Sequence, residues 1–522
     1  MPHKLCALLL AFVLMLPLLP VSGQAESSLR WSDRYSYVLR EDGTAQITGY
    51  ESPSSDMVIP SELDGHPVAS LSGCFSFIGA VSSVSIPDTL TEIVGNPFAS
   101  EPVETFIVSP DHPALEVVDG ALYSKGDHRL IACPRGTPVE TFRIQPGTLV
   151  IEDFAFMSCR SLAEVTIPEG VTRIGRRAFS HCGLKRVTLP DSVGEIGDNP
   201  FSVCKALTEI RVSPDHPALE VVDGALYSKG DHRLVCLPAG LSAARFQAQE
   251  GTEAVGAWAF AYCANLEEVL LPDSVASIGE SAFSHCEALA LCPLPQGITA
   301  IEANTFAACE SLEEITLPEG VTRIGGGAFM ECLSLSAVTL QATLADIGDY
   351  AFSGCAFAEL ELPAALTSLG RGVFEECVSL THMELPAGLT ELPEELFTFC
   401  DQLMSVTIPE GVTAIGEKAF CGCVSLTALR LPESLAFIDV EAFEGCESLE
   451  EITLPDSVAE IGEGAFANCE ALALVTLSAG TEIIGEEAFE DCPDLTLTAP
   501  ENSAAERYCL ENDISFLPLG EE

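Results

Sequence analysis

Apolar residues recur along most of this chain in one fixed order, with a step of 22 or 23 residues between copies. In the copy from Leu312 to Leu335 the apolar positions are Leu312, Ile315, Leu317, Val321, Ile324, Ala328, Phe329, Cys332 and Leu335. The frame contains Phe-x-x-Cys fourteen times, including Phe156/Cys159, Phe179/Cys182, Phe260/Cys263, Phe329/Cys332 and Phe489/Cys492. Self-similarity at this period predicts a solenoid whose stacked coils bury a shared column of Phe and Cys.

Within each coil the pattern predicts two short extended segments and one compact turn. Ile315 and Leu317 alternate with Thr316 at the two-residue period of a half-buried strand. Pro318-Glu319-Gly320 ends this strand, because proline lacks an N–H and glycine tolerates a tight turn. Residues 321–324 form the second extended segment. Residues 328–332 form a compact turn or a single helical turn.

Two gaps in the Phe-x-x-Cys series hold the same long block. Residues 109–130 have the sequence SPDHPALEVVDGALYSKGDHRL, and residues 213–234 repeat it letter for letter. Apolar runs on either side of Asp-Gly predict a hairpin. About 35 extra residues cannot hold a core alone, so we expect two long hairpin-bearing coils, at about 99–147 and 202–251. With Phe75 and Phe98, which keep the step without the cysteine, the sequence predicts about 16 coils.

The first 25 residues have the features of a secretory signal peptide. His3 and Lys4 precede a leucine-rich run from Leu5 to Leu19, and Gly23-Gln24-Ala25 is a suitable cleavage site. The run is shorter than a membrane span requires, and no later stretch approaches that length. We expect a secreted chain without a transmembrane span after cleavage, with an uncleaved anchor as the alternative.

The coil from Leu312 to Cys332, LEEITLPEGVTRIGGGAFMEC, resembles the BspA-type leucine-rich repeat of bacterial surface and secreted proteins. Residues 37–68 resemble that family's opening coil, Asp119 to Ser124 its long-coil motif, and residues 503–516 its closing segment. The resemblance implies a right-handed β-rich solenoid with an opening cap at 26–68, repeats over 69–500 and a closing segment at 501–522. It also implies an adhesin-like role and no catalytic residues.

Charge changes the expected partners. The chain has 78 Asp and Glu against 24 Lys and Arg, a formal net charge of −54. A surface of this sign repels phosphate backbones, so we expect no nucleic-acid partner. We interpret the acids as a solvating coat that keeps the solenoid monomeric, with loose binding of divalent cations as the alternative.

Five basic residues lie close together in sequence and are the only positional indication of a ligand site. Ion pairing with Glu164, Glu169 and Asp191 would make them structural. An anion-binding patch for acidic glycans or an acidic protein is the alternative, and on that hypothesis the candidate ligand-binding residues are Arg173, Arg176, Arg177, Lys185 and Arg186.

Cysteine and histidine are abundant enough to require an interpretation. Fourteen of 21 cysteines share one register, which favours buried free thiols, although stacked neighbours could lie within disulfide range. Cys421 and Cys509 lie off register and are the candidates for reactive or paired thiols. Asp111-His112 and Asp127-His128 could share a metal, but repeated turn chemistry explains them better. We assign no catalytic, cofactor-binding or metal-binding residue.

These patterns indicate a non-enzymatic, secreted or cell-surface binding protein that engages a protein or glycan of a host or of neighbouring bacteria. The alternatives are a structural spacer and a hydrolase of extracellular polymers. The residues before the last strand leucine should line the binding face. They are Thr166, Thr188, Arg211, Leu270, Pro293, Thr316, Thr339, Glu361, Glu384, Thr407, Arg430, Thr453 and Thr476.

Overall fold

The computed structural model describes residues 29–51, 54–73, 81–99, 102–135, 139–427 and 429–519. The predicted leader and Phe75 lie outside these ranges. The chain divides into two compact units, Met1–Val221 and Val222–Glu522. Each unit is described by itself.

The strands of the first unit are short and come in chain order. They are β1 (Arg30–Ser32), β2 (Tyr35–Leu39), β3 (Ala45–Tyr50), β4 (Asp56–Val58), β5 (Glu62–Leu63), β6 (His66–Leu71), β7 (Ser83–Ile86), β8 (Glu92–Ile93), β9 (Thr105–Val108), β10 (Leu115–Val118), β11 (Ala121–Ser124), β12 (Arg129–Ala132), β13 (Thr141–Arg143), β14 (Val150–Ile151), β15 (Glu164–Thr166), β16 (Arg173–Ile174), β17 (Arg186–Thr188), β18 (Glu195–Ile196), β19 (Glu209–Arg211) and β20 (Leu219–Val222), which reaches the boundary.

The second unit continues the same pattern and contains the helix α2. Its elements are β21 (Ala225–Ser228), β22 (Arg233–Cys236), β23 (Arg245–Gln247), β24 (Ala254–Val255), β25 (Glu268–Leu270), β26 (Ser277–Ile278), β27 (Ala300–Ile301), β28 (Glu314–Thr316), β29 (Arg323–Ile324), β30 (Ala337–Thr339), β31 (Asp346–Ile347), β32 (Ser368–Leu369), β33 (His382–Glu384), β34 (Ser405–Thr407), β35 (Ala414–Ile415), β36 (Phe437–Ile438), β37 (Glu451–Thr453), β38 (Glu460–Ile461), β39 (Leu474–Thr476), β40 (Ile483–Ile484), β41 (Thr496–Ala499), α2 (Ala504–Asn512) and β42 (Ser515–Pro518).

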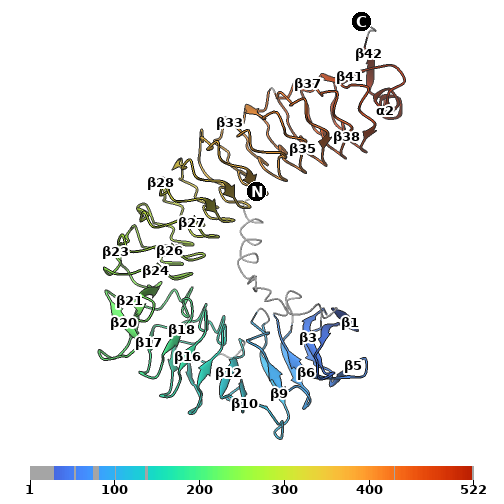
Figure 1. The fold of residues 1–522 in the computed structure, drawn as a ribbon. Coiled ribbons are helices and arrows are strands. Elements are labelled where there is room, and N and C mark those ends of the chain that lie inside the picture. The colour runs from blue at the N-terminus through green and yellow to red at the C-terminus, as the bar shows by residue number, and fades with distance from the viewer. Residues whose placement is uncertain are drawn as a thin grey trace. The chain divides into compact units, whose positions relative to one another are not determined.

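Successive coils of each unit stack side by side and pair through parallel strands, which confirms the predicted β-rich repeat solenoid (Figure 1). The expected number of 16 coils is too low, because the structure has about 20 turns. The turns that the count missed lie outside the Phe series. One is the opening turn on β3, which pairs in parallel with β6, and others belong to the long blocks, where β12 and β22 pair in parallel with β14 and β24.

The type coil contains the two predicted strands, β28 and β29, but its turn is not helical. Gly327 and Glu331, two residues before and after Phe329, have φ of +60° and +58°. The same two positions have positive φ in all fourteen Phe-x-x-Cys coils. This alternation prevents a helix and leaves every second amide free to pair with the next coil. The N–H of Phe329 accordingly donates to the carbonyl of Ala351 at 2.8 Å.

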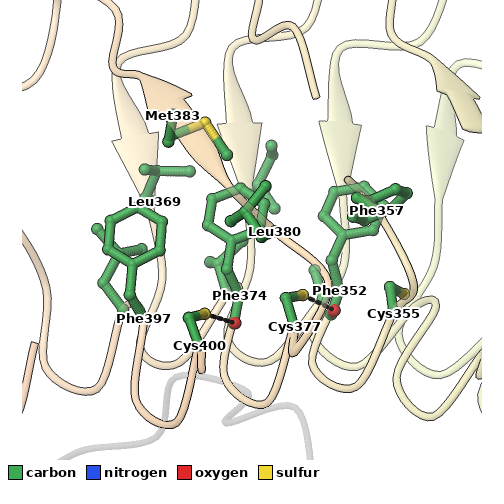
Figure 2. Close-up of a cluster of buried hydrophobic side chains, with 14 of the residues drawn as sticks. Phe352, Cys355, Phe357, Leu369, Phe374, Cys377, Leu380, Met383, Phe397 and Cys400 are labelled. Atoms are coloured by element: carbon green, nitrogen blue, oxygen red, sulfur yellow. Dashed lines mark hydrogen bonds between the residues drawn. The ribbon is translucent and has the colours of Figure 1, made fainter. Parts of the chain in front are cut away.

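Stacked phenylalanine rings form the centre of the core in both units. Ring centroids of successive coils lie 4.8 to 6.2 Å apart, with nearly parallel planes along most of the column (Figure 2). Perpendicular rings end the stacks: Phe142 packs on Phe156 at 5.3 Å, and Phe246 on Phe260 at 5.4 Å. At the carboxyl end Tyr508 of α2 meets Phe489 at 5.9 Å. Each buried ring removes a large apolar area from water and gains a favourable contact with the rings stacked on it.

The long block forms the expected hairpin. β10 and β11 pair antiparallel, with Val118 opposite Ala121, so Asp119 and Gly120 make a two-residue turn. Their φ values are +49° and +85°, the left-handed pair that a type I′ turn requires. β11 then pairs with β12, which returns the chain to the parallel stack.

Candidate interaction surfaces

In most coils the first strand presents two outward side chains around one buried residue, although no strand forms at Pro293, Glu361 or Arg430. In β28, Glu314 and Thr316 are exposed and Ile315 is buried. Parallel register places Thr316 beside Thr339 of the next coil, so outward residues form columns along the stack. Of the thirteen positions predicted for this strand face, twelve are exposed and Thr476 is partly exposed. The result is a flat ladder, in which threonine is the most frequent residue.

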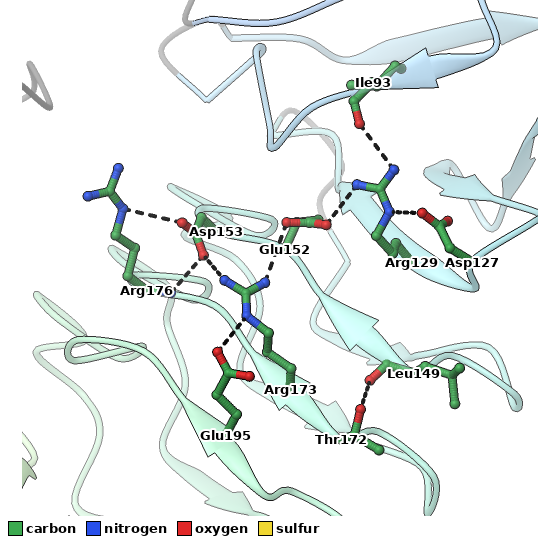
Figure 3. A network of polar contacts seen from close by, with 10 residues as sticks. All are labelled: Ile93, Asp127, Arg129, Leu149, Glu152, Asp153, Thr172, Arg173, Arg176 and Glu195. Atoms are coloured by element: carbon green, nitrogen blue, oxygen red, sulfur yellow. Dashed lines mark hydrogen bonds and ion pairs between the residues drawn. The ribbon is translucent and has the colours of Figure 1, made fainter. Parts of the chain in front are cut away.

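Two of the five candidate basic residues are engaged by carboxylates. Arg173 of β16 lies 3.1 Å from Asp153 and 3.2 Å from Glu195, and Arg176 lies 3.3 Å from Asp153 (Figure 3). These acids are not the expected Glu164, Glu169 and Asp191. The difference follows from stacking, since parallel register brings Arg173 opposite Glu195, 22 residues away.

The other three candidates lie in different surroundings. Arg177 is buried, and its guanidinium lies 5.6 Å from the ring centroid of Phe154, which Arg176 approaches to 5.3 Å. Lys185 and Arg186 are exposed at β17, which belongs to a different sheet from β16. The five residues therefore lie in different surroundings, and their role in ligand binding stays a prediction.

The structure instead gathers a cation cluster that sequence proximity did not reveal. It consists of Arg135, Arg160, Arg177 and Lys205 around the imidazole of His181. Burial first, and then these four cations, lower the pKa of His181 to about 4. The segment 129–211 has eleven Lys and Arg against nine Asp and Glu, in a chain of net charge −54. That local reversal, read within the repeat frame, is the signal that could have located the cluster.

His112 and His216 of the long blocks have structural partners. The Nδ1 atom of buried His112 accepts the N–H groups of Ala114 at 3.2 Å and Leu115 at 3.0 Å, so its Nε2–H donates to the Pro87 carbonyl at 3.1 Å. His216 makes the corresponding contacts. Each imidazole ties its block to the preceding coil, and neither nitrogen is available to a metal. Among the described residues no cluster of His, Cys, Asp or Glu has the arrangement of a metal site.

The cysteine column has a second role that the sequence did not predict. Cys332 donates its thiol proton to the carbonyl of Phe306 in the preceding coil, with 3.1 Å between Sγ and oxygen. Cys377 and Cys400 make the same contact with Phe352 and Phe374 (Figure 2). This thiol ladder extends through both units, as with Cys182 and Phe156 at 3.1 Å. The residue therefore supplies a hydrogen bond between coils as well as apolar volume.

The described cysteines are free thiols, including the two off-register candidates. Burial, followed by the charge of Glu444, raises the pKa of Cys421 to about 12. Burial raises the pKa of Cys509 to about 11, and that of Cys332 in the column to about 12. Since the thiolate is the nucleophile, neither off-register cysteine has the lowered pKa of a reactive thiol.

A polar network crosses three coils of the second unit. The Tyr350 hydroxyl donates to Glu395 at 2.8 Å, and Arg371 donates to both oxygens of the same carboxylate, at 2.8 and 2.7 Å. Beside it, burial and then the charges of Glu395 and Glu376 raise the pKa of Glu375 to about 7. Both oxygens of Glu395 accept hydrogen bonds from these donors, so the network holds neighbouring coils together. It therefore does not have the arrangement of a catalytic acid–base pair.

The structure thus defines a leucine-rich-repeat solenoid, a class of protein that presents a repetitive surface to its partners. The family model described as BspA type Leucine rich repeat region (6 copies) matches residues 133–226, 239–356, 322–450 and 390–515. The chain therefore belongs to the BspA-type leucine-rich-repeat family, and the resemblance inferred from the sequence is confirmed. Proteins of this family and fold are generally non-enzymatic and act in protein interactions.

Solved structures of bacterial leucine-rich-repeat proteins are also similar to the chain. A leucine-rich repeat protein from Bacteroides ovatus is 23% identical, with a TM-score of 0.41 and coverage of 94% of this chain and 100% of that one. A leucine rich cell surface protein from Faecalibacterium prausnitzii is 26% identical, with a TM-score of 0.39 and coverage of 69% and 95%. No curated protein matches the chain. Within the described residues, no helix has the length and apolar composition of a membrane span.

Proposed function

We propose that the chain is a non-enzymatic binding protein that acts outside the cell, either secreted or associated with the cell surface. Its partner on this proposal is a protein or glycan of a host or of neighbouring bacteria, and the contact is adhesin-like. The leader expected at residues 1–25 and membership of the BspA-type family support this location.

The observation that supports the proposal best is the strand face. Its columns hold exposed side chains at a spacing of about 4.8 Å per coil, set by parallel pairing. A ladder of this kind offers many equivalent weak contacts, which suits a large, extended partner bound by several sites at once. Lys185 and Arg186 lie on this face and would contribute to binding of acidic partners.

The test is capture of partners from host matrix, mucus and bacterial surface extracts by residues 26–522, at low and high salt. A face variant, Thr316→Arg/Thr339→Arg/Thr407→Arg, places three arginines on exposed strand positions. Its matched control, Thr322→Arg/Thr367→Arg/Thr413→Arg, changes three exposed threonines that precede strands of the other sheet.

We expect saturable binding that the face variant reduces at least tenfold and the control leaves within threefold. Equal loss in both variants would contradict use of the strand face. Absence of any saturable partner would favour a structural spacer, and cleavage of a polymer in the same extracts would favour a hydrolase.

A further inference from the structure

The cation cluster lies at the turn edge of three successive coils of the first unit. The N–H of Ser158 donates to the carbonyl of Ser180, and the N–H of His181 to that of Ser202, at 2.8 and 3.0 Å. These bonds align the three turns. Arg160 and Lys205 each follow the column cysteine of the outer two coils, and both are exposed. They therefore flank the His181 coil from either side, about 10 Å apart by strand spacing.

The middle coil presents no side chain between these two cations. Gly183 occupies the position that corresponds to Arg160 and Lys205. A Cβ atom at Gly183 would lie 2.4 Å from the backbone oxygen of Arg160, so no other residue fits there. The half-buried imidazole of His181 lies two residues before Gly183 in the same turn.

Serine hydrogen bonds orient this imidazole as a donor. The hydroxyl of Ser202 donates to Ser180 Oγ at 2.9 Å, which frees the Ser180 proton for His181 Nδ1, also at 2.9 Å. A neutral His181 then has its proton on Nε2. The cluster thus offers one N–H donor together with the positive charges of Arg135, Arg160, Arg177 and Lys205.

We infer that this turn edge binds the sulfate or carboxylate group of an acidic glycan. Guanidinium and ammonium groups with a neighbouring N–H donor match the oxygens of such an anion. A glycan spaces its anionic groups with neutral sugar rings, so one group can reach the cluster. A nucleic acid or an acidic protein would carry continuous negative charge onto a surface whose net charge is −54.

Because the neighbouring cations lower the pKa of His181, a change in that pKa can report anion binding at the site. The four cations disfavour protonation of the imidazole, and a bound anion would offset them. Anion binding should therefore raise the pKa of His181 above about 4, and binding should strengthen as the pH falls toward that value.

The experiment uses the full chain and three probes at 50 and 300 mM salt: a sulfated chondroitin oligosaccharide, its desulfated form, and a neutral oligosaccharide of equal length. Inorganic sulfate and a short DNA duplex serve as additional arms. The site variant is Arg160→Gln/Lys205→Gln. The control, Arg30→Gln/Arg34→Gln, removes the same charge from exposed residues of the same unit.

We expect millimolar to micromolar binding of the sulfated glycan, weaker binding of the desulfated form through its carboxylates, and none of the neutral sugar. The site variant should weaken binding at least tenfold and the control less than threefold, with unchanged thermal melting in both. In histidine-labelled protein, the resonance absent from His181→Gln should titrate at higher pH when the sulfated glycan is present.

Equal weakening by both variants would overturn the inference, as would binding of the neutral sugar or an unmoved His181 titration at saturation. Inorganic sulfate bound as tightly as the glycan would identify a simple ion site, and tighter binding of DNA a general polyanion patch. The residues of the site lie on turns and outside the strands that form the strand face. Loss of glycan binding only in the site variant, and of extract binding only in the strand-face variant, keeps this inference and the proposed function separable.

Discussion

The two units share one core and differ in surface charge. The second unit has eight Lys and Arg against 51 Asp and Glu, a net of −43, and the first has 16 against 27, a net of −11. Yet the buried ladder is alike in both: Sγ to carbonyl distances are 3.1 Å for Cys182 in the first unit and for Cys332 in the second. The repeated apolar positions therefore determine the architecture but not the surface charge. Binding sites are to be sought among the outward residues, which vary from coil to coil.

The largest expected effect tests whether the core is truly equivalent in the two units. Phe179→Ala in the first and Phe329→Ala in the second each remove a fully buried, stacked ring. Each should lower the free energy of unfolding of its unit by about 3–5 kcal/mol. Hydrogen exchange on peptides of each unit measures this.

The exposed strand residues Thr166→Ala and Thr316→Ala are matched controls and should change stability by less than about 0.5 kcal/mol. A Phe179→Ala cost far below that of Phe329→Ala would show that the first unit does not depend on its column in the same way.

The thiol ladder gives a smaller but equally shared effect. Cys182→Ala and Cys332→Ala each remove one hydrogen-bond donor between neighbouring coils and leave a small cavity, at a cost of about 1–2 kcal/mol. Denaturant unfolding measures the change. Cys421→Ala is the control, because Cys421 lies off the column and its thiol contacts only a carboxylate at 3.6 Å. If the control costs as much as Cys332→Ala, the carbonyl hydrogen bond contributes nothing measurable.

A fall in pH should change the stability of the two units in opposite directions. In the second unit the folded-state pKa of Glu375 is raised from 4.5 to about 7, so the folded form binds the extra proton. Its stability should fall as the pH rises from about 4.5 through 7, by about 1 kcal/mol after allowance for partial exposure. Glu375→Gln should flatten this slope in pH-dependent hydrogen exchange, whereas an unchanged slope would contradict the assignment.

The first unit should show the opposite slope. The folded-state pKa of His181 is lowered from 6.5 to about 4, so the unfolded form binds the proton more readily. Stability is complete above pH 6.5 and is lost as the pH falls toward 4, again by about 1 kcal/mol. His181→Gln should remove this loss. If hydrogen exchange of this unit in the wild-type protein stays the same between these two pH values, the prediction is wrong.

The smallest effect is kinetic and concerns the carboxyl end of the cysteine column. Cys492 is partly exposed, and its hydrogen bond with the Cys469 thiol lowers its pKa, whereas Cys332 and the other interior members of the column are buried. Iodoacetamide at pH 8 should therefore modify Cys492 before the buried members of the column, as followed by peptide mass mapping. Simultaneous modification of Cys332 would show that coils open locally on the labelling time scale.

Sequence reasoning succeeded where the cause is local and repeated. The period located the strands at residues 314–316 and 323–324, since alternation and turn residues act over a few positions. It could not decide between a helical turn and the observed turn, because the alternating φ values depend on amides pairing with the next coil. The coil count was low, since the opening turn and the turns of the long blocks lie outside the Phe series.

The candidate basic residues were grouped by their adjacency in the chain, which stacking does not follow. Adjacency in sequence grouped Arg173 with Arg186, although they lie in separate sheets. Stacking instead joins residues separated by one or two coil lengths, as with Arg160 and Lys205, which are 45 positions apart. Placing every charge in the repeat frame before grouping would have found that pair, but not the serine hydrogen bonds that orient His181.

The identity of residues 109–130 and 213–234 bears on how such a chain lengthens. His112 and His216 make the same contacts, with 3.1 and 3.0 Å to the carbonyls of Pro87 and Pro190. The second copy of the block thus makes the same hydrogen bonds to its preceding coil as the first, because a coil contacts only its immediate neighbours. Duplication of whole coils therefore costs little in stability. Length can grow by copying, while charge and binding diversify afterwards.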